Sequence, residues 1–162
     1  MIELITANLG DISRIQKIFD DSPTYFLNIS GKKAPPDAAN KTFETFPHKK
    51  TKEDKLVLIV RADGEDIGVV DLIHAYPDSE TAFLGLLLLS EKVHRTGLGR
   101  TTYLEVEKVV QEVGLKKIRL AATETNPVVP FWEKMGFHLT GEKKEYRNKK
   151  VHSVSLLMEK EI

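Results

Sequence analysis

The sequence predicts an α/β (α+β) protein with one mixed, mostly antiparallel sheet of about seven strands flanked by helices. Short apolar runs of strand length alternate with helical stretches in the order βα, loops, βββ, αβαββ. Asp-Gly and Pro-Asp pairs mark turns between the middle strands, which is typical of antiparallel neighbours. The 162 residues contain no repeat and no low-complexity linker, so we expect a single domain over residues 1–162.

The N-terminal third combines a strand and a helix with a long irregular segment. Residues 2–6 alternate apolar and polar side chains, and residues 12–19 place apolar side chains at helical spacing after a cap at Asn8. Residues 20–54 are rich in Pro, Gly and charge, which predicts loops with a short helix at 37–45. Such segments often cover a binding site, and a solvated connection explains the composition equally well.

The middle of the chain predicts a three-strand meander over residues 56–60, 67–73 and 81–89. The last of these runs is apolar throughout, as expected for a central strand that is covered on both faces. The periodicity then predicts, in order, a helix over 97–113, a strand over 117–122, a short helix over 130–135, and strands over 137–141 and 151–158 with a charged loop over 142–150 between them.

Composition excludes several classes of function. The chain has 24 basic and 24 acidic residues, and this balance argues against non-specific binding to nucleic acid or to a membrane surface. It has no Cys, hence no disulfide and no thiol nucleophile, and its five His show no ligand spacing, so no metal is expected. Because no apolar run approaches ~20 residues and the acidic N-terminus is unlike a signal peptide, we expect a cytoplasmic location.

One segment predicts an anion site. The apolar strand at 81–89 leads through a polar loop into the longest predicted helix, at the sequence His94-Arg95-Thr96-Gly97-Leu98-Gly99-Arg100-Thr101. A helix start leaves backbone N–H groups unpaired, glycines allow close approach, and two arginines add positive charge. Taken alone, this pattern fits a phosphate-bearing ligand and a plain strand–helix connection equally well.

A second segment, residues 126–137, follows the next strand and opens at the same edge of the predicted sheet. With both segments, the sequence resembles the GNAT superfamily of acyl-CoA N-acyltransferases. Residues 94–99 are similar to that family's Arg/Gln-x-x-Gly-x-Gly/Ala pyrophosphate loop, and residues 131–137 (Phe-Trp-Glu-Lys-Met-Gly-Phe) to its Phe/Leu-Tyr-Glu-Lys-Leu-Gly-Phe signature. The resemblance is strong over residues 56–158, which would form the cofactor-binding core, and weaker over residues 1–55, where the family varies with its substrates.

The resemblance implies the GNAT fold and a site for acetyl-CoA. Backbone groups of Leu87, Leu88 and Leu89 would contact the pantetheine arm and the acetyl carbonyl. Asn126, Phe131 and Trp132 would line the other wall of the cofactor slot. The pyrophosphate would lie on the loop and the first helical turn, formed by His94, Arg95, Thr96, Gly97, Leu98, Gly99, Arg100 and Thr101.

Three positions depart from the family pattern. His94 replaces the usual Arg or Gln, and Arg95 stands where glycine is common. Trp132 occupies the position at which the family often has a tyrosine that protonates the departing thiolate, and an indole N–H is not an acid near neutral pH. Tyr146 could substitute or be an exposed loop residue, and a thiolate with a pKa near 8.5 can also leave unaided.

Transfer to an amine requires a group that removes a proton. The candidates are Asp71 and His74 on the strand around residues 67–73, and Glu80 at the start of the next strand. Since Asp71 and His74 are three positions apart, a regular strand points them to opposite faces. Tyr25 fits a substrate-side residue and a packing aromatic equally well.

The leading hypothesis is an N-acetyltransferase that transfers the acetyl group of acetyl-CoA directly to a primary amine of a small molecule or peptide. The alternative is a catalytically silent acyl-CoA-binding sensor or scaffold, which Trp132 favours. A third reading is a nucleotide-binding regulator, in which ATP would compete with CoA. The family's habit allows a homodimer, and the sequence shows no interface signature.

Overall fold

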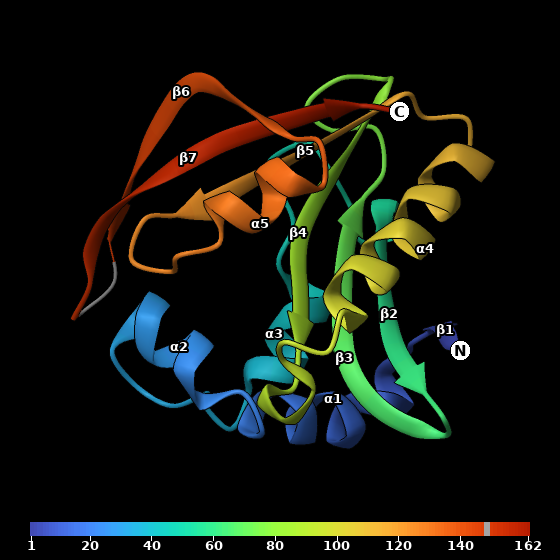
Figure 1. The fold of residues 1–162 in the computed structure, drawn as a ribbon, viewed down its shortest axis with the longest axis vertical. Coiled ribbons are helices and arrows are strands. Elements are labelled where there is room, and N and C mark those ends of the chain that lie inside the picture. Colours follow the sequence, from blue (N-terminus) through green and yellow to red (C-terminus); the bar gives the residue numbers. More distant parts are fainter. Residues whose placement is uncertain (148–149) are drawn as a thin grey trace.

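One seven-stranded sheet forms the centre of the protein (Figure 1). The computed structural model describes residues 1–147 and 150–162. The strand order is β1-β2-β3-β4-β5-β7-β6, and only the β4–β5 pair is parallel among the described strands. The predicted mixed, mostly antiparallel sheet is therefore confirmed. The strands are β1 (Ile2–Thr6), β2 (Lys55–Ala62), β3 (Glu65–Ile73), β4 (Thr81–Leu89), β5 (Lys117–Thr123), β6 (His138–Arg147) and β7 (His152–Glu161).

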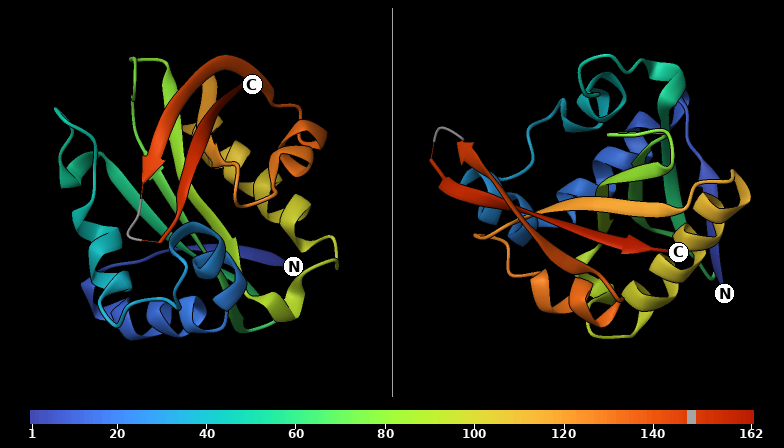
Figure 2. Two further views of the ribbon diagram at one scale, coloured as in Figure 1. Left: turned by 90° about the vertical axis from the view of Figure 1, so that its left-hand side faces the viewer. Right: turned by 90° about the horizontal axis from the view of Figure 1, so that it is seen from above.

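Helices pack on both faces of the sheet (Figure 2). Side chains of β2 alternate between two cores: Leu58 and Val60 pack with α4 and α5, whereas Val57 and Ile59 pack with α1, α2 and α3. No helix in the described residues is long and apolar enough to cross a membrane. The helices are α1 (Ile12–Asp20), α2 (Pro23–Ser30), α3 (Ala38–Glu44), α4 (Leu98–Glu112) and α5 (Val129–Lys134), with 3₁₀ turns η1 (Leu9–Asp11), η2 (Lys52–Asp54) and η3 (Glu91–Val93).

Helix α2 lies where the sequence predicts a loop. Pro23 lies in the first turn of α2, where a backbone N–H has no helical acceptor. The N–H that proline lacks therefore costs the helix no hydrogen bond. Gly31 ends it in the left-handed conformation, with φ of 72°. Both signals are present in the sequence, but a helix of 8 residues carries no clear apolar stripe. Packing of Phe26 against Phe19, with ring centroids 5.3 Å apart, holds α2 on α1 and decides its structure.

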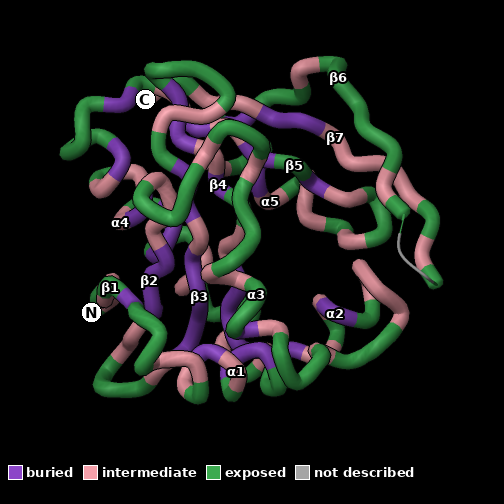
Figure 3. Tube along the Cα trace, turned by 180° about the vertical axis from the view of Figure 1, so that it is seen from behind, coloured by how far each residue is buried: buried purple, intermediate pink, exposed green. Residues whose placement is uncertain are grey.

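Strand β6 is longer than predicted. It continues to Arg147 through the charged stretch at 142–150 that the sequence predicts as a loop, of which residues 148–149 lie outside the described residues. Most residues of β6 are exposed (Figure 3), so no alternation of polar and apolar residues marks the strand. Backbone pairing with β7, from Lys143↔Leu156 to Arg147↔His152, defines it instead.

Strands β4 and β5 pair over part of their length and then diverge (Figure 1). Their pairing runs from Thr81↔Lys117 to Leu84↔Leu120 and stops there. A bulge at Gly85 follows, and β4 stays paired with β3 up to Leu89 while β5 stays paired with β7. Each strand thus keeps its outer partner and leaves its inner edge unpaired, which opens a gap in the middle of the sheet.

Candidate functional site

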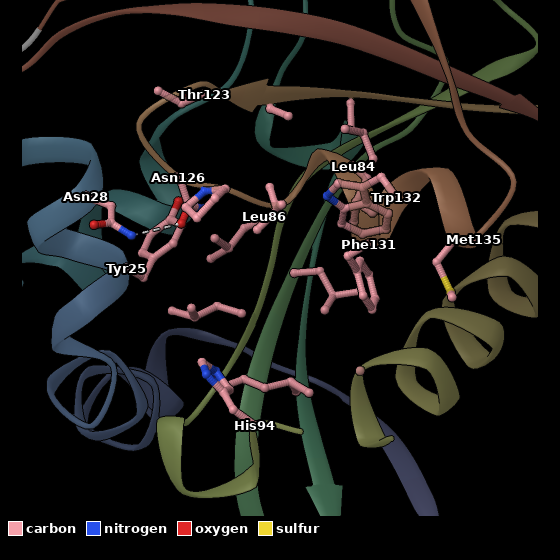
Figure 4. A pocket seen from close by; sticks show the side chains of 18 of the residues that line it. Tyr25, Asn28, Leu84, Leu86, His94, Thr123, Asn126, Phe131, Trp132 and Met135 are labelled. Carbon is pink, nitrogen blue, oxygen red and sulfur yellow. Dashed lines mark hydrogen bonds between the residues drawn. The ribbon is translucent and has the colours of Figure 1, made fainter. Parts of the chain in front are cut away.

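A cavity of about 860 Å³ occupies the gap between β4 and β5 (Figure 4). Residues 84–89 of β4 and 120–123 of β5 form its long walls. Helix α5 contributes Phe131 and Trp132, and helix α2 contributes Tyr25 and Asn28 at the other end. A cavity of this volume and apolar lining is typical of a small-molecule site.

The first end of the cavity, which we call the anion end, is formed by the loop before α4 and the first turn of that helix. The loop turns through two left-handed residues, Arg95 with φ of 61° and Gly97 with φ of 86°. An added Cβ on Gly97 would meet no atom within 4 Å, so the start of α4 is open to a ligand. The N–H groups of this first turn lack helical partners and carry positive partial charge, which suits a phosphate.

The charged side chains strengthen that preference. Arg95, Arg100 and Lys134 line the cavity, and all three are cations. None of the lining residues in the described part of the chain is Asp or Glu. The anion end therefore combines helix-terminal N–H groups with unopposed positive charge.

The imidazole of His94 connects the loop to the end of β4. Its Nε2 lies 2.9 Å from the carbonyl oxygen of Leu89, so this departure from the family pattern fixes where the loop leaves the strand. Most of the predicted cofactor-binding residues of β4 and this loop line the cavity: Leu87, Leu88, Leu89, His94, Arg95, Gly97, Gly99 and Arg100. Thr96, Leu98 and Thr101 do not line it. The Thr96 hydroxyl donates to the Val93 carbonyl at 2.5 Å instead.

Trp132 forms both a wall of the cavity and part of the core. Its side chain is 7% exposed, and its ring packs edge-on against Tyr103, Phe131 and Phe137 at centroid distances of 5.7, 4.9 and 5.3 Å. Gly99 lets α4 approach this cluster, since an added Cβ would lie 3.3 Å from Phe131. Aromatic packing thus accounts for a tryptophan at this position.

The second end of the cavity, the α2 end, carries uncharged polar groups. The Asn28 side chain donates to Asn126 Oδ1 at 3.3 Å, which joins α2 to the segment before α5 (Figure 4). Tyr25 lies one turn earlier on α2, and burial, followed by the nearby Tyr146, raises its pKa to about 12. The Tyr146 hydroxyl donates to the Ile29 carbonyl at 2.5 Å, and burial raises its pKa as well. Tyr146 does not line the cavity itself.

Asp71 lies beside the cavity but is already paired. Lys55 Nζ donates to Asp71 Oδ2 at 2.7 Å, and the two side chains are only 4% and 14% exposed, respectively. Asp71 Oδ1 is buried without a hydrogen-bond partner among the described residues. Burial raises the pKa of this carboxyl, and Lys55 opposes that shift. Asp71 reaches the cavity wall at Gly85, which lines the cavity and on which an added Cβ would lie 3.3 Å from Asp71 Oδ2.

His74 and Glu80 lie at the opposite end of β4 from the anion end. Both are exposed, and neither lines the cavity. The His74 N–H donates to the Asp54 carbonyl at 2.8 Å, and the Glu80 carbonyl accepts from the N–H of Lys116 at 2.8 Å. The structure therefore does not bring these two predicted residues together with the rest of the site.

A comparison with models of protein families identifies the family of this chain. A model of the family described as the Acetyltransferase (GNAT) family matches residues 14–137. The chain belongs to the GNAT acetyltransferase family. The matched range includes both the loop at Gly97 and the segment at Trp132, so the resemblance seen in the sequence is confirmed. GNAT membership supports acyltransferase activity and binding of coenzyme A.

Solved structures agree on the GNAT fold. An acetyltransferase from Thermus thermophilus superposes with a TM-score of 0.78 at 22% identity, covering 100% of this chain and 97% of that one. A spermidine N-acetyltransferase from Vibrio cholerae, in complex with CoA and spermine, gives 0.76 at 18% identity, with 99% and 95% covered. PaiA N-acetyltransferase from Thermoplasma acidophilum, in complex with coenzyme A, gives 0.68 at 21%, with 100% and 99% covered. A search of the curated proteins found no match.

Three lining residues that bear on the chemistry of this GNAT protein were not predicted from the sequence: Asn28, Gly85 and Lys134. Asn28 is one turn from Tyr25, so a helix recognised between Pro23 and Gly31 would have placed both on one face. Gly85 could have been singled out as a glycine inside an apolar strand, which often marks a bulge. For Lys134 the sequence offers no signal beyond its place in the second motif.

Proposed function

We propose that this GNAT protein is an N-acetyltransferase that transfers the acetyl group of acetyl-CoA directly to a primary amine. One observation carries the proposal: a single cavity has a cationic end suited to phosphates and an uncharged polar end suited to a second substrate. Because the chain has no Cys, no thiol is available to hold the acetyl group between two half-reactions. Direct transfer with both substrates bound is therefore the simplest scheme.

The residues present fit acetyl-CoA. The first-turn N–H groups of α4, with Arg95 and Arg100, would hold the pyrophosphate, and the open space at Gly97 leaves room for it. The inner edge of β4 at residues 87–89 offers unpaired backbone groups to the pantetheine arm. Phe131 and Trp132 supply an apolar wall.

The thioester supplies an electrophilic carbonyl. In the transfer, the amine nitrogen bonds to the carbonyl carbon, the carbon–sulfur bond breaks, and the proton lost by nitrogen ends on the released thiol. The protein's contribution is to hold the two groups in line and to place backbone N–H donors near the carbonyl oxygen. Tyr25, whose hydroxyl stays protonated, is the proposed hydrogen-bond donor at the α2 end.

The N-terminal region, residues 1–55, is the proposed substrate side, because α2 supplies Tyr25 and Asn28 to the cavity. Of the four predicted proton-transfer residues, Asp71 lies beside the cavity at Gly85, and the Tyr146 hydroxyl donates to α2, so these two stay candidates. The alternative function, an acyl-CoA sensor without turnover, is favoured by one observation. Trp132 places a buried aromatic ring where a tyrosine hydroxyl would assist the leaving thiolate.

Calorimetry with acetyl-CoA and an assay for released thiol test the proposal. Gly97→Glu places a carboxylate at the anion end, and we expect a loss of affinity of at least about 100-fold from charge repulsion. Gly64→Glu is the matched control, because Gly64 has a similar φ of 81° and open surroundings in the β2–β3 turn, away from the cavity. Amine-dependent thiol release supports the transferase, binding without release supports the sensor, and absence of binding to folded protein contradicts both.

A further inference from the structure

We propose that the α2 end takes the acceptor amine in its uncharged form, and that it therefore selects an α-amino group next to an amide over an alkylamine or polyamine. The inference rests on the proposed N-acetyl transfer and adds the class of acceptor. Two observations carry it: the described cavity lining contains no carboxylate, and its α2 end contains a pair of amide side chains.

Three carboxylates around the α2 end are paired or turned away from it, and Glu124, which follows the lining residue Thr123, is exposed and does not itself line the cavity. Asp71 is bound to Lys55, and its second oxygen is buried. Glu91 accepts the Thr24 N–H at 2.7 Å, at the start of α2. Glu145 precedes Tyr146 on β6; since the Tyr146 hydroxyl reaches α2, strand alternation points Glu145 to the other face of the sheet.

An ammonium group is poorly accommodated in such surroundings. Moving a charged amine out of water without a counter-charge is costly, so the group sheds its proton before it enters. A polyamine, with several ammonium groups, is the least favoured acceptor by this argument.

The amide pair suits a neighbouring amide of the acceptor. With Asn28 Nδ2 bonded to Asn126 Oδ1, the pair leaves Asn28 Oδ1 as an acceptor and Asn126 Nδ2 as a donor, neither with another partner among the described residues. One donor and one acceptor side by side complement the C=O and N–H of a peptide group. The Tyr25 hydroxyl, which also has no partner among the described residues, adds a third uncharged group.

The two kinds of amine differ greatly in the fraction that is neutral. With reference pKa values of about 7.7–8.0 for an α-amino group and about 10.4 for a lysine side chain, the neutral fraction near pH 7.5 differs by roughly 200-fold. The more basic amine is the better nucleophile once neutral, which offsets part of this difference. We therefore expect a preference of at least roughly tenfold in kcat/KM.

Two isomers isolate the effect. Nε-acetyl-lysine amide and Nα-acetyl-lysine amide contain the same atoms and differ in which nitrogen is free, and spermidine serves as the polycation. Thiol release from acetyl-CoA is measured with each at one pH near 7.5. Asn28→Asp places a carboxylate at the α2 end, and Asn40→Asp, on an exposed position of α3 outside the cavity, adds the same charge as a control.

The wild type is expected to prefer the free α-amine, and Asn28→Asp to shift the ratio at least roughly fivefold toward the ε-amine and spermidine, with no shift in Asn40→Asp. Equal or better use of the ε-amine or spermidine by the wild type overturns this proposal and leaves the N-acetyltransferase standing. Acetyl-CoA binding with no thiol release for any amine overturns both. The wild-type comparison decides the matter even if Asn28→Asp does not fold.

Discussion

The two ends of the cavity are built in different ways. The anion end comes from one continuous segment, His94 to Arg100. The α2 end joins Asn28 to Asn126, which are 98 positions apart, and depends on a helix held by packing. The anion end is positive and set by backbone conformation, whereas the α2 end is uncharged and set by tertiary contacts. In a fold that serves many acceptors, the cofactor end can stay constant while the other end changes.

The contrast between a positive anion end and an uncharged α2 end would be wrong if the α2 end used a carboxylate. Asp71 is the residue that tests this. Asp71→Asn leaves the buried Lys55 ammonium without a counter-charge. We expect the free energy of unfolding, measured by urea denaturation, to fall by about 3–5 kcal/mol. The double variant Lys55→Met/Asp71→Leu removes both charges and should recover most of that loss.

The double variant also separates structure from catalysis. If the pair only supports the sheet, the double variant retains amine-dependent thiol release. A folded double variant that binds acetyl-CoA normally but releases no thiol would show that Asp71 takes part in proton transfer, and the α2 end would no longer be without a working carboxylate.

Arg95 tests the contribution of positive charge at the anion end. Arg95→Gly removes one positive charge and also relieves a non-glycine residue with φ of 61°. We expect the Kd of acetyl-CoA, measured by calorimetry, to rise about tenfold, and less at high salt. Stability should change by less than about 1 kcal/mol, because the greater chain entropy of glycine offsets the relieved strain. An equal loss of affinity at all salt concentrations would contradict a charge effect.

The effect expected at Tyr25 is confined to the α2 end. Tyr25→Phe keeps the ring and removes the hydroxyl, so kcat/KM for the amine should fall roughly tenfold while the Kd of acetyl-CoA is unchanged. Tyr76→Phe, at a tyrosine outside the cavity, is the control and should change neither value. A fall in acetyl-CoA affinity for Tyr25→Phe would show that the two ends are not separable.

The same residue has a pH signature. Burial raises the pKa of Tyr25 from 10.0 to about 12, so folding favours its neutral form. Its contribution to stability is fully present below pH 10 and is lost as the pH rises through the folded-state value. The phenolate absorbance step near pH 12 should disappear in Tyr25→Phe.

The sheet, most of its strands and the strand–loop–helix turn around Gly97 could be predicted from the sequence, because each depends on local patterns. The loop around Gly97 is one contiguous motif, and the strands show apolar runs. Strand β6 extended beyond its prediction because both of its faces are largely exposed and leave no alternation to detect. Asn28 and Asn126 could not be paired in advance, since only the packed position of α2 brings them together.

The positions of His74 and Glu80 could have been inferred from topology. β3 runs antiparallel to β4, so the end of β3 lies beside the start of β4, away from the edge where the anion loop begins. Attention to strand direction, in addition to alternation, would have separated these residues from Asp71. The Lys55–Asp71 ion pair could be predicted only from the pairing register of β2 and β3, because Lys55 lies opposite Ile73, two positions beyond Asp71.

The divergence of β4 and β5 has a consequence for amide hydrogen exchange. Successive N–H groups of a strand point to alternate edges, so in residues 86–89 every second amide is bonded to β3 while its neighbours face the gap. In the free protein these neighbours exchange with solvent without any unfolding, although they belong to a central strand. A ligand that accepts hydrogen bonds from them slows their exchange and leaves the β3-bonded amides nearly unaffected. The rate contrast between adjacent amides of β4 therefore reports directly whether the gap in the sheet is filled.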